Sequence, residues 1–127
     1  MQLTRDQPDK RQPFIQSYAE GVFRVSGVRH HGSVLILPET IVAWPVEDMT
    51  GLSLDSLAPV FGIEPPIEML IIGCGGTFAR PPAELVQGLR PRGIGIETMA
   101  TGAACRTYNV LAGESRRIAA ALIALRG

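Results

Sequence analysis

The chain has 127 residues, of which 46% are hydrophobic and 19% charged. This length and composition predict one compact domain that needs neither a metal nor disulfides, and they exclude a largely disordered chain. Twelve Lys and Arg balance twelve Asp and Glu without a basic cluster, so no nucleic-acid partner and no charge-driven membrane binding are expected.

The first half of the chain is typical of short antiparallel strands. Residues 1–12 are polar and predict a flexible N-terminal arm, which leaves residues 13–127 as a single α/β domain. Glycines separate β-type segments, and a further pair of segments around a turn at Glu39 predicts a hairpin. The expected N-terminal part is mainly antiparallel, with four or five strands within residues 14–18, 21–27, 28–31, 32–37 and 40–45.

The second half changes its periodicity. Ser53 is placed to cap a helix over about residues 54–61, and residues 68–73 form a continuous apolar run that is typical of a strand buried on both faces. Two prolines at 81 and 82 open a helix that runs to about residue 89, and residues 93–97 predict the next strand. This order predicts a right-handed parallel βαβ element.

Two more helices are predicted at the C-terminus. Thr101 is placed to cap a helix that ends near Gly113, and Ser115 to Leu125 predicts the last helix. That last segment is apolar almost all round, so it must pack on more than one side, against its own sheet or against another subunit.

A glycine-rich turn follows the apolar strand of residues 68–73. Gly73, Gly75 and Gly76, with Glu97 ending the next strand 24 residues after Gly73, resemble a dinucleotide fingerprint. Phe78 occupies the place of the last glycine, and the loop is too long before its helix. The turn is therefore interpreted as one that brings neighbouring backbone close, in preference to a nucleotide site.

The two cysteines, Cys74 and Cys105, match no zinc spacing, and no metal or cofactor is expected. Cys105 is the best nucleophile candidate because a helix N-terminus and Arg106 would stabilise its thiolate. Its only candidate bases, His30 and His31, lie in the N-terminal sheet and point to opposite faces. A buried apolar role for Cys105 is therefore favoured, and a reversible link between the two thiols stays open.

The segments 32–38, 70–75, 93–99 and 103–111, together with Trp44, carry a resemblance to a known family. The chain resembles, from about residue 14 to 125, the small domains of unknown function that include mitochondrial NADH dehydrogenase (complex I) assembly factor three and the adipogenesis-associated domain protein. The resemblance implies a single α/β domain whose antiparallel part packs beside a three-layer unit. Cys74 departs from the family, which often has another small residue there.

For function, the resemblance implies a non-enzymatic, protein-binding domain that assists assembly of respiratory complex I, with no catalytic residues. Its partner would be a complex I subunit or another assembly factor, and the domain itself a monomer or weak homodimer. The absence of an apolar span or secretory segment predicts a cytoplasmic protein with no direct membrane insertion. The expected binding surface lies at the strand ends, at Gly73, Cys74, Gly75, Gly76, Thr101, Cys105, Arg106 and Asn109.

A second hypothesis uses the same strand ends differently. A small anionic ligand or nucleotide would bind in a crevice at the helix N-termini that begin near Pro81 and Thr101. Thiol chemistry at Cys105 would then accompany binding. Crevices outside the carboxyl ends of parallel strands are common ligand sites, so this alternative remains open from the sequence.

Overall fold

The computed structural model describes residues 12–126, which form two β-sheets. The smaller sheet is antiparallel and has the order β1 (Ile15–Ala19), β2 (Val22–Val25), β3 (Val28–His31). The larger sheet is mixed, with the order β5-β4-β8-β6-β7. Its strands are β4 (Val34–Leu37), β5 (Thr40–Ala43), β6 (Met69–Gly73), β7 (Gly95–Met99) and β8 (Ile118–Leu122).

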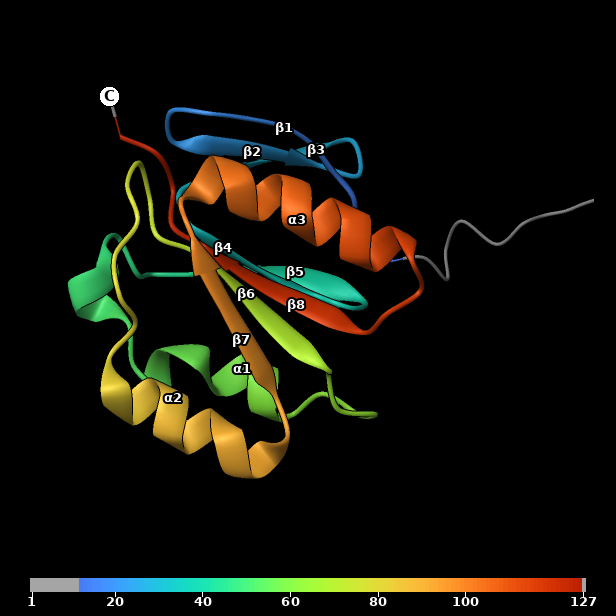
Figure 1. Ribbon diagram of the computed structural model, residues 1–127. Helices are drawn as coiled ribbons and strands as arrows, with labels where there is room; N and C mark the ends of the chain where they lie inside the picture. Colours follow the sequence, from blue (N-terminus) through green and yellow to red (C-terminus); the bar gives the residue numbers. More distant parts are fainter. Residues whose placement is uncertain (1–11, 127) are drawn as a thin grey trace, which may run out of the picture.

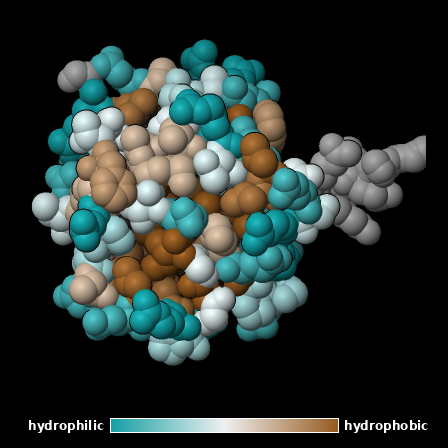
Figure 2. Space-filling model, in the orientation of Figure 1, coloured by the Kyte–Doolittle hydropathy of each residue, from teal (hydrophilic) through white to brown (hydrophobic). Residues whose placement is uncertain are grey.

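The larger sheet is covered on both faces (Figure 1). Helix α3 (Thr101–Gly113) and the smaller sheet pack on one face, around Tyr108 and Phe23. Helices α1 (Ala58–Phe61) and α2 (Ala83–Leu89) pack on the other face, around Leu57 and Leu89. Each face therefore has its own apolar cluster, and the sheet lies between them. In the same orientation, apolar residues gather near the middle of the visible surface and hydrophilic residues around its margin (Figure 2).

These elements confirm the predicted α/β class and its parallel βαβ element. The strands β6 and β7 pair in parallel, and α2 lies between them in the sequence. The predicted helix over 54–61 is divided into a 3-10 turn, Asp55–Leu57, and α1. The N-terminal strands divide between the sheets, because all four residues of β4 are buried. A strand buried on both faces needs cover on both faces, which only the larger sheet offers.

The prediction of a helix from Ser115 to Leu125 is wrong, because this segment forms β8 at the centre of the larger sheet. β8 pairs antiparallel with β4 and parallel with β6. Its side chains alternate, with Ala120 and its even-numbered neighbours facing α3 and Ala119 and Ala121 facing α1 and α2. Alanine favours a helix, but a central strand position with cover on both faces overrides that propensity.

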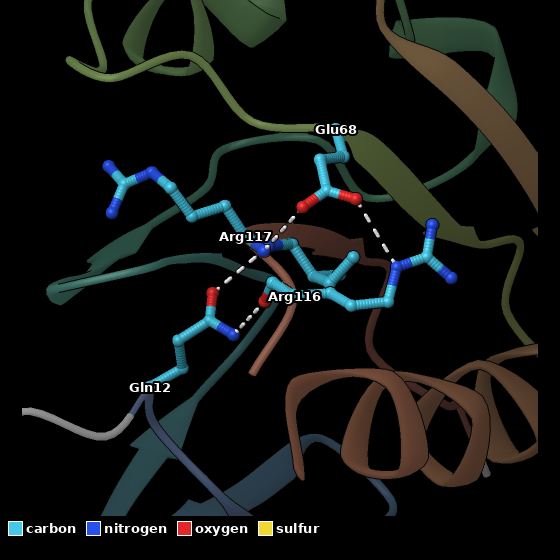
Figure 3. A network of polar contacts seen from close by, with 5 residues as sticks. Gln12, Glu68, Arg116 and Arg117 are labelled. Carbon is cyan, nitrogen blue, oxygen red and sulfur yellow. Dashed lines mark hydrogen bonds and ion pairs between the residues drawn. The ribbon is translucent and has the colours of Figure 1, made fainter. Parts of the chain in front are cut away.

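The entry into β8 is held by a polar network (Figure 3). The Glu68 carboxylate accepts hydrogen bonds from the Arg116 side chain, at 3.3 Å, and from the Arg117 backbone N–H, at 3.4 Å. The Gln12 side-chain amide donates to the Arg116 carbonyl and accepts from the Ile118 N–H. Gln12 thus belongs to the folded domain, whereas the rest of the predicted arm lies outside the described residues.

Within residues 12–126, no helix is both long and apolar enough to cross a bilayer.

Overpacking of β8 tests its central position. Ala120 is fully buried in the apolar cluster beneath α3, which also contains Ala104. Replacing Ala120 by leucine should lower the free energy of unfolding by about 1–3 kcal/mol, because a close-packed core has no room for the added carbons. Urea unfolding followed by circular dichroism measures the change. The control is Ala83→Leu at the exposed start of α2, and equal stability of the two variants would contradict this packing.

Candidate functional site at the strand ends

The C-terminal ends of β6 and β7 lie side by side, as the sequence predicts for adjacent parallel strands. Gly73 is paired with Met99, and the Cys74 N–H donates to the Met99 carbonyl at 2.8 Å. From this edge the chain leaves β6 toward α2 on one face and leaves β7 toward α3 on the other (Figure 1). Such a divergence is where α/β sheets usually form a binding crevice.

Thr101 closes this crevice with its side chain. Its hydroxyl accepts a hydrogen bond from the Gly75 N–H at 2.8 Å and donates one to the Ile123 carbonyl at 2.7 Å. Its own N–H donates to the Gly75 carbonyl at 2.8 Å. The expectation that Thr101 caps α3 is therefore wrong, because the N-cap position is Ala100, which makes no side-chain hydrogen bond to the helix.

The glycine turn serves close packing. A Cβ atom on Gly73 would lie 2.9 Å from the Thr101 hydroxyl and 3.1 Å from the Leu122 side chain. Gly75 has a φ of +96°, a conformation that other residues rarely adopt. A phosphate at this turn would need free backbone N–H donors, but that of Gly75 is already bound to Thr101. The geometry agrees with the close-approach interpretation of this turn.

Both thiols are free and buried. Burial raises the pKa of Cys105 to about 12, although the nearby Arg106 acts in the opposite direction. Burial also raises the pKa of Cys74, whose Sγ donates to the Ala79 carbonyl at 3.4 Å. Desolvation outweighs the guanidinium charge, so the thiolate is scarce at neutral pH, which agrees with the buried role favoured for Cys105 over the nucleophile alternative.

The other predicted site residues lie further along α3, against β1. Arg106 is exposed, and its Nη1 donates to the Tyr18 hydroxyl at 2.9 Å. The Asn109 side chain accepts from the Ile15 N–H at 2.9 Å and donates to the Ile15 carbonyl at 2.8 Å. Asn109 thus attaches β1 to α3. The structure brings Thr101 together with the glycine turn but places Asn109 two helical turns away.

A cavity of about 210 Å³ opens at the strand ends. Two acidic residues line it: Glu47 is paired with Arg126 at 3.5 Å, and Asp48 accepts a hydrogen bond from the Thr50 hydroxyl. That hydrogen bond holds the pKa of Asp48 below its usual value, so its carboxylate is charged. The carboxylates disfavour an anion in this cavity, which is lined by Glu47, Asp48, Cys74, Gly75, Gly76, Ile123, Ala124 and Arg126.

Phe78 is a surface feature that the sequence analysis did not assign to the site. It lies in the loop between the glycine turn and α2, and its side chain is 61% exposed. Arg80 in the same loop is also exposed. Its position in the sequence, between two glycines and two prolines, could have indicated an aromatic side chain in an exposed loop. In the described part of the chain, no group of three or more His, Cys, Asp or Glu is placed to hold a metal ion.

The family model described as "Protein of unknown function (DUF498/DUF598)" matches residues 15–123. The chain is 38% identical over 109 residues to NADH dehydrogenase (ubiquinone) 1 alpha subcomplex assembly factor 3 of Danio rerio. This match covers 86% of the chain and 63% of the relative. The human assembly factor of the same name is covered to 60%, so the chain spans about three-fifths of these relatives.

Solved structures with the same fold include two bacterial proteins. A crystal structure of an outer membrane protein from Bartonella henselae is 34% identical, with a TM-score of 0.85 over 92% of this chain and 98% of that one. The solution structure of a Mth938-like domain from Bordetella pertussis is 28% identical, with a TM-score of 0.77 over 98% of this chain and 92% of that one.

Removal of the Thr101 hydroxyl tests the closure of the crevice. Thr101→Val keeps the shape of the side chain but leaves the Gly75 N–H and the Ile123 carbonyl without partners. We expect a loss of about 1–3 kcal/mol in the free energy of unfolding, since each buried group loses its hydrogen bond. Chemical denaturation measures it. Thr77→Val, in the exposed part of the loop, is the control, and an equally small loss in both variants would argue against this role.

The raised pKa of Cys105 predicts a loss of stability at alkaline pH. Its thiol has a pKa of about 12 in the folded protein, against 9.0 as the ordinary value. The unfolded chain therefore releases this proton first, and stability falls as pH rises above 9, by at most about 1.4 kcal/mol per pH unit. Urea unfolding between pH 8 and pH 10.5 should show a shallower decline for Cys105→Ala than for the unmodified chain. Parallel declines would contradict the assignment.

Proposed function

The chain belongs to the DUF498/DUF598 family, and from this membership we propose that it is a non-enzymatic domain that binds a protein partner during assembly of a NADH dehydrogenase complex. The observation that carries the proposal is the 38% identity with an assembly factor over 109 residues. The partner would be a subunit of that complex or another assembly factor.

The extent of the match supports this assignment. The family match begins at Ile15, the first residue of β1, and ends at residue 123, just after β8. The shared part therefore includes both sheets, the helices α1, α2 and α3, and the strand-end surface. A role performed by this part of the assembly factors would be available to this chain as well.

The chemistry of the strand ends also favours binding without turnover. The Cys105 thiol is buried and neutral, and the hydrogen-bonding groups of Gly75 are used within the fold. No observation favours the anionic-ligand alternative, because Glu47 and Asp48 line the cavity. The loop that follows the glycine turn exposes the side chains of Phe78 and Arg80 to solvent. Exposed aromatic and arginine side chains are the residue types that most often dominate protein interfaces.

Arg106, in the second turn of α3, is a second candidate for the partner contact. Its side chain is exposed, and among residues 12–126 it makes one side-chain hydrogen bond, to the Tyr18 hydroxyl. The guanidinium has further N–H donors in a fixed planar arrangement. We therefore place the partner across the loop of Phe78 and the first turns of α3.

Affinity capture from the source cells tests the proposal. The tagged full chain should co-purify with subunits of a NADH dehydrogenase or with another of its assembly factors. Phe78→Ala and Arg106→Ala should each reduce the captured amount by about tenfold, because each removes a side chain of an interface-dominating type. Quantitative mass spectrometry of the captured proteins measures the loss.

The controls remove similar side chains elsewhere. Phe14→Ala truncates a phenylalanine that is 56% exposed next to β1, and Arg90→Ala truncates an exposed arginine beyond α2. Both should capture as much as the unmodified chain. If the unmodified chain captures no NADH dehydrogenase component, or if Phe78→Ala and Arg106→Ala fold and capture the full amount, the proposed function is wrong.

A further inference from the structure

The outer face of the smaller sheet carries two ordered rows of side chains. Residues that pair directly across antiparallel strands lie on the same face, and every second residue along a strand shares it. Phe23 and Val25 of β2 point inward to the core. The outward rows are Ser17–Arg24–Arg29 and Ala19–Val22–His31, each crossing β1, β2 and β3 in that order.

One of these rows places two positive charges next to each other. Arg24 and Arg29 are direct cross-strand partners, and both are exposed. Within residues 12–126, neither forms an ion pair, since the ion pairs there involve Arg116, Arg117 and Arg126. Like charges opposite one another destabilise a strand pair. A local conflict of this kind, with nothing in the described fold that relieves it, is typical of a functional surface.

The surroundings of the two arginines fit an anion. A hollow of about 360 Å³ lies here, and no carboxylate lines it. Ser17 adds a hydroxyl in the row of the arginines, while Ala19 and Val22 make the adjacent row partly apolar. The lining residues are Ser17, Tyr18, Ala19, Val22, Arg24, Arg29 and His31. The hollow combines a cationic strip with a short apolar strip.

We propose that this face binds an acidic segment of a protein partner, with carboxylates against Arg24 and Arg29 and an apolar side chain against Val22. Guanidinium groups bind carboxylates through two parallel hydrogen bonds, which gives both strength and orientation. This inference rests on the proposed protein-binding function and gives the chemistry of one partner segment. It uses a surface separate from the loop of Phe78.

Other anionic partners fit this face less well. Membrane surfaces are recognised by clusters of about four to eight basic residues, and this face has two arginines. Single-stranded nucleic acids need aromatic rings on which bases stack. Tyr18 does not offer one, because it points to α3, where its hydroxyl oxygen would lie 2.8 Å from a Cβ atom on Gly102. A free phosphate needs converging backbone N–H groups, whereas those of β2 lie between two paired strands.

A peptide titration tests the inference on the full chain. The probe is a short fluorescent peptide in which glutamates flank a leucine, and its counterpart carries glutamines in their place. The glutamate peptide should bind, should shift backbone amide resonances of β1, β2 and β3, and should weaken with added salt. The glutamine peptide should bind about tenfold more weakly or less. Resonance shifts confined to another surface would overturn the inference.

Charge reversal locates the binding to the two arginines. Arg24→Glu and Arg29→Glu should each weaken binding of the glutamate peptide by about tenfold or more. Arg90→Glu makes the same change in net charge at an exposed position beyond α2 and should leave the affinity unchanged. If all three variants weaken binding equally, the effect is one of net charge alone and the inference is wrong.

Stability separates lost binding from damaged folding. Arg29→Glu replaces a like-charge pair with an opposite-charge pair across β2 and β3. The melting temperature should therefore rise by about 1–4 °C while peptide binding is lost. A fall in melting temperature that accompanies the loss of binding would mean that the strand pair, and not the contact, has been disturbed. That result would contradict the like-charge assignment.

Three further probes distinguish the other partner classes, namely inorganic phosphate, phosphatidylserine vesicles and a single-stranded oligonucleotide. Binding of any of these at β1, β2 and β3 without binding of the glutamate peptide would overturn the inference. Failure of every probe to bind would overturn it too. These outcomes are distinct from failure of the proposed function, which is measured by capture of NADH dehydrogenase components and by the Phe78 and Arg106 variants.

Discussion

The hydroxyl of Thr101 joins three parts of the chain that are far apart in sequence. It receives the Gly75 N–H that follows β6, and it donates to the Ile123 carbonyl that follows β8. This arrangement requires α3 to approach the sheet closely, which the absence of a side chain on Gly73 permits. The position of α3, and with it the attachment of β1 through Asn109, depends on this contact.

The same contact decides what the strand ends can do. In many α/β proteins the edge beyond the parallel strands presents free N–H groups to an anion. Here the N–H and the carbonyl of Gly75 are both hydrogen-bonded to Thr101, and burial keeps the Cys105 thiol protonated. The position at which such proteins usually bind a ligand therefore serves here to hold α3 against the sheet. The side chain that this region exposes to a partner is Phe78, in the loop that follows the glycine turn.

The two proposed surfaces differ in their physical basis. The loop of Phe78 offers an exposed aromatic side chain next to the glycine turn, which is held by Thr101. The outer face of the smaller sheet offers charge, and it keeps Arg24 opposite Arg29 at some expense of stability. Arg106, which belongs to the first surface, donates a hydrogen bond to Tyr18 of β1, which lines the hollow of the second.

The sequence by itself determined the class of fold, the hairpin, the parallel βαβ element and the close packing at the glycine turn, because these follow from local periodicity and from the conformations of glycine and proline. It misplaced β8, since a run of alanines suits a helix and a central strand equally well until its neighbours are known. It also misjudged the role of Thr101, whose hydrogen bonds depend on which segments lie against it. Only the tertiary structure set Arg24 against Arg29, because register is a property of paired strands and cannot be read from either strand alone.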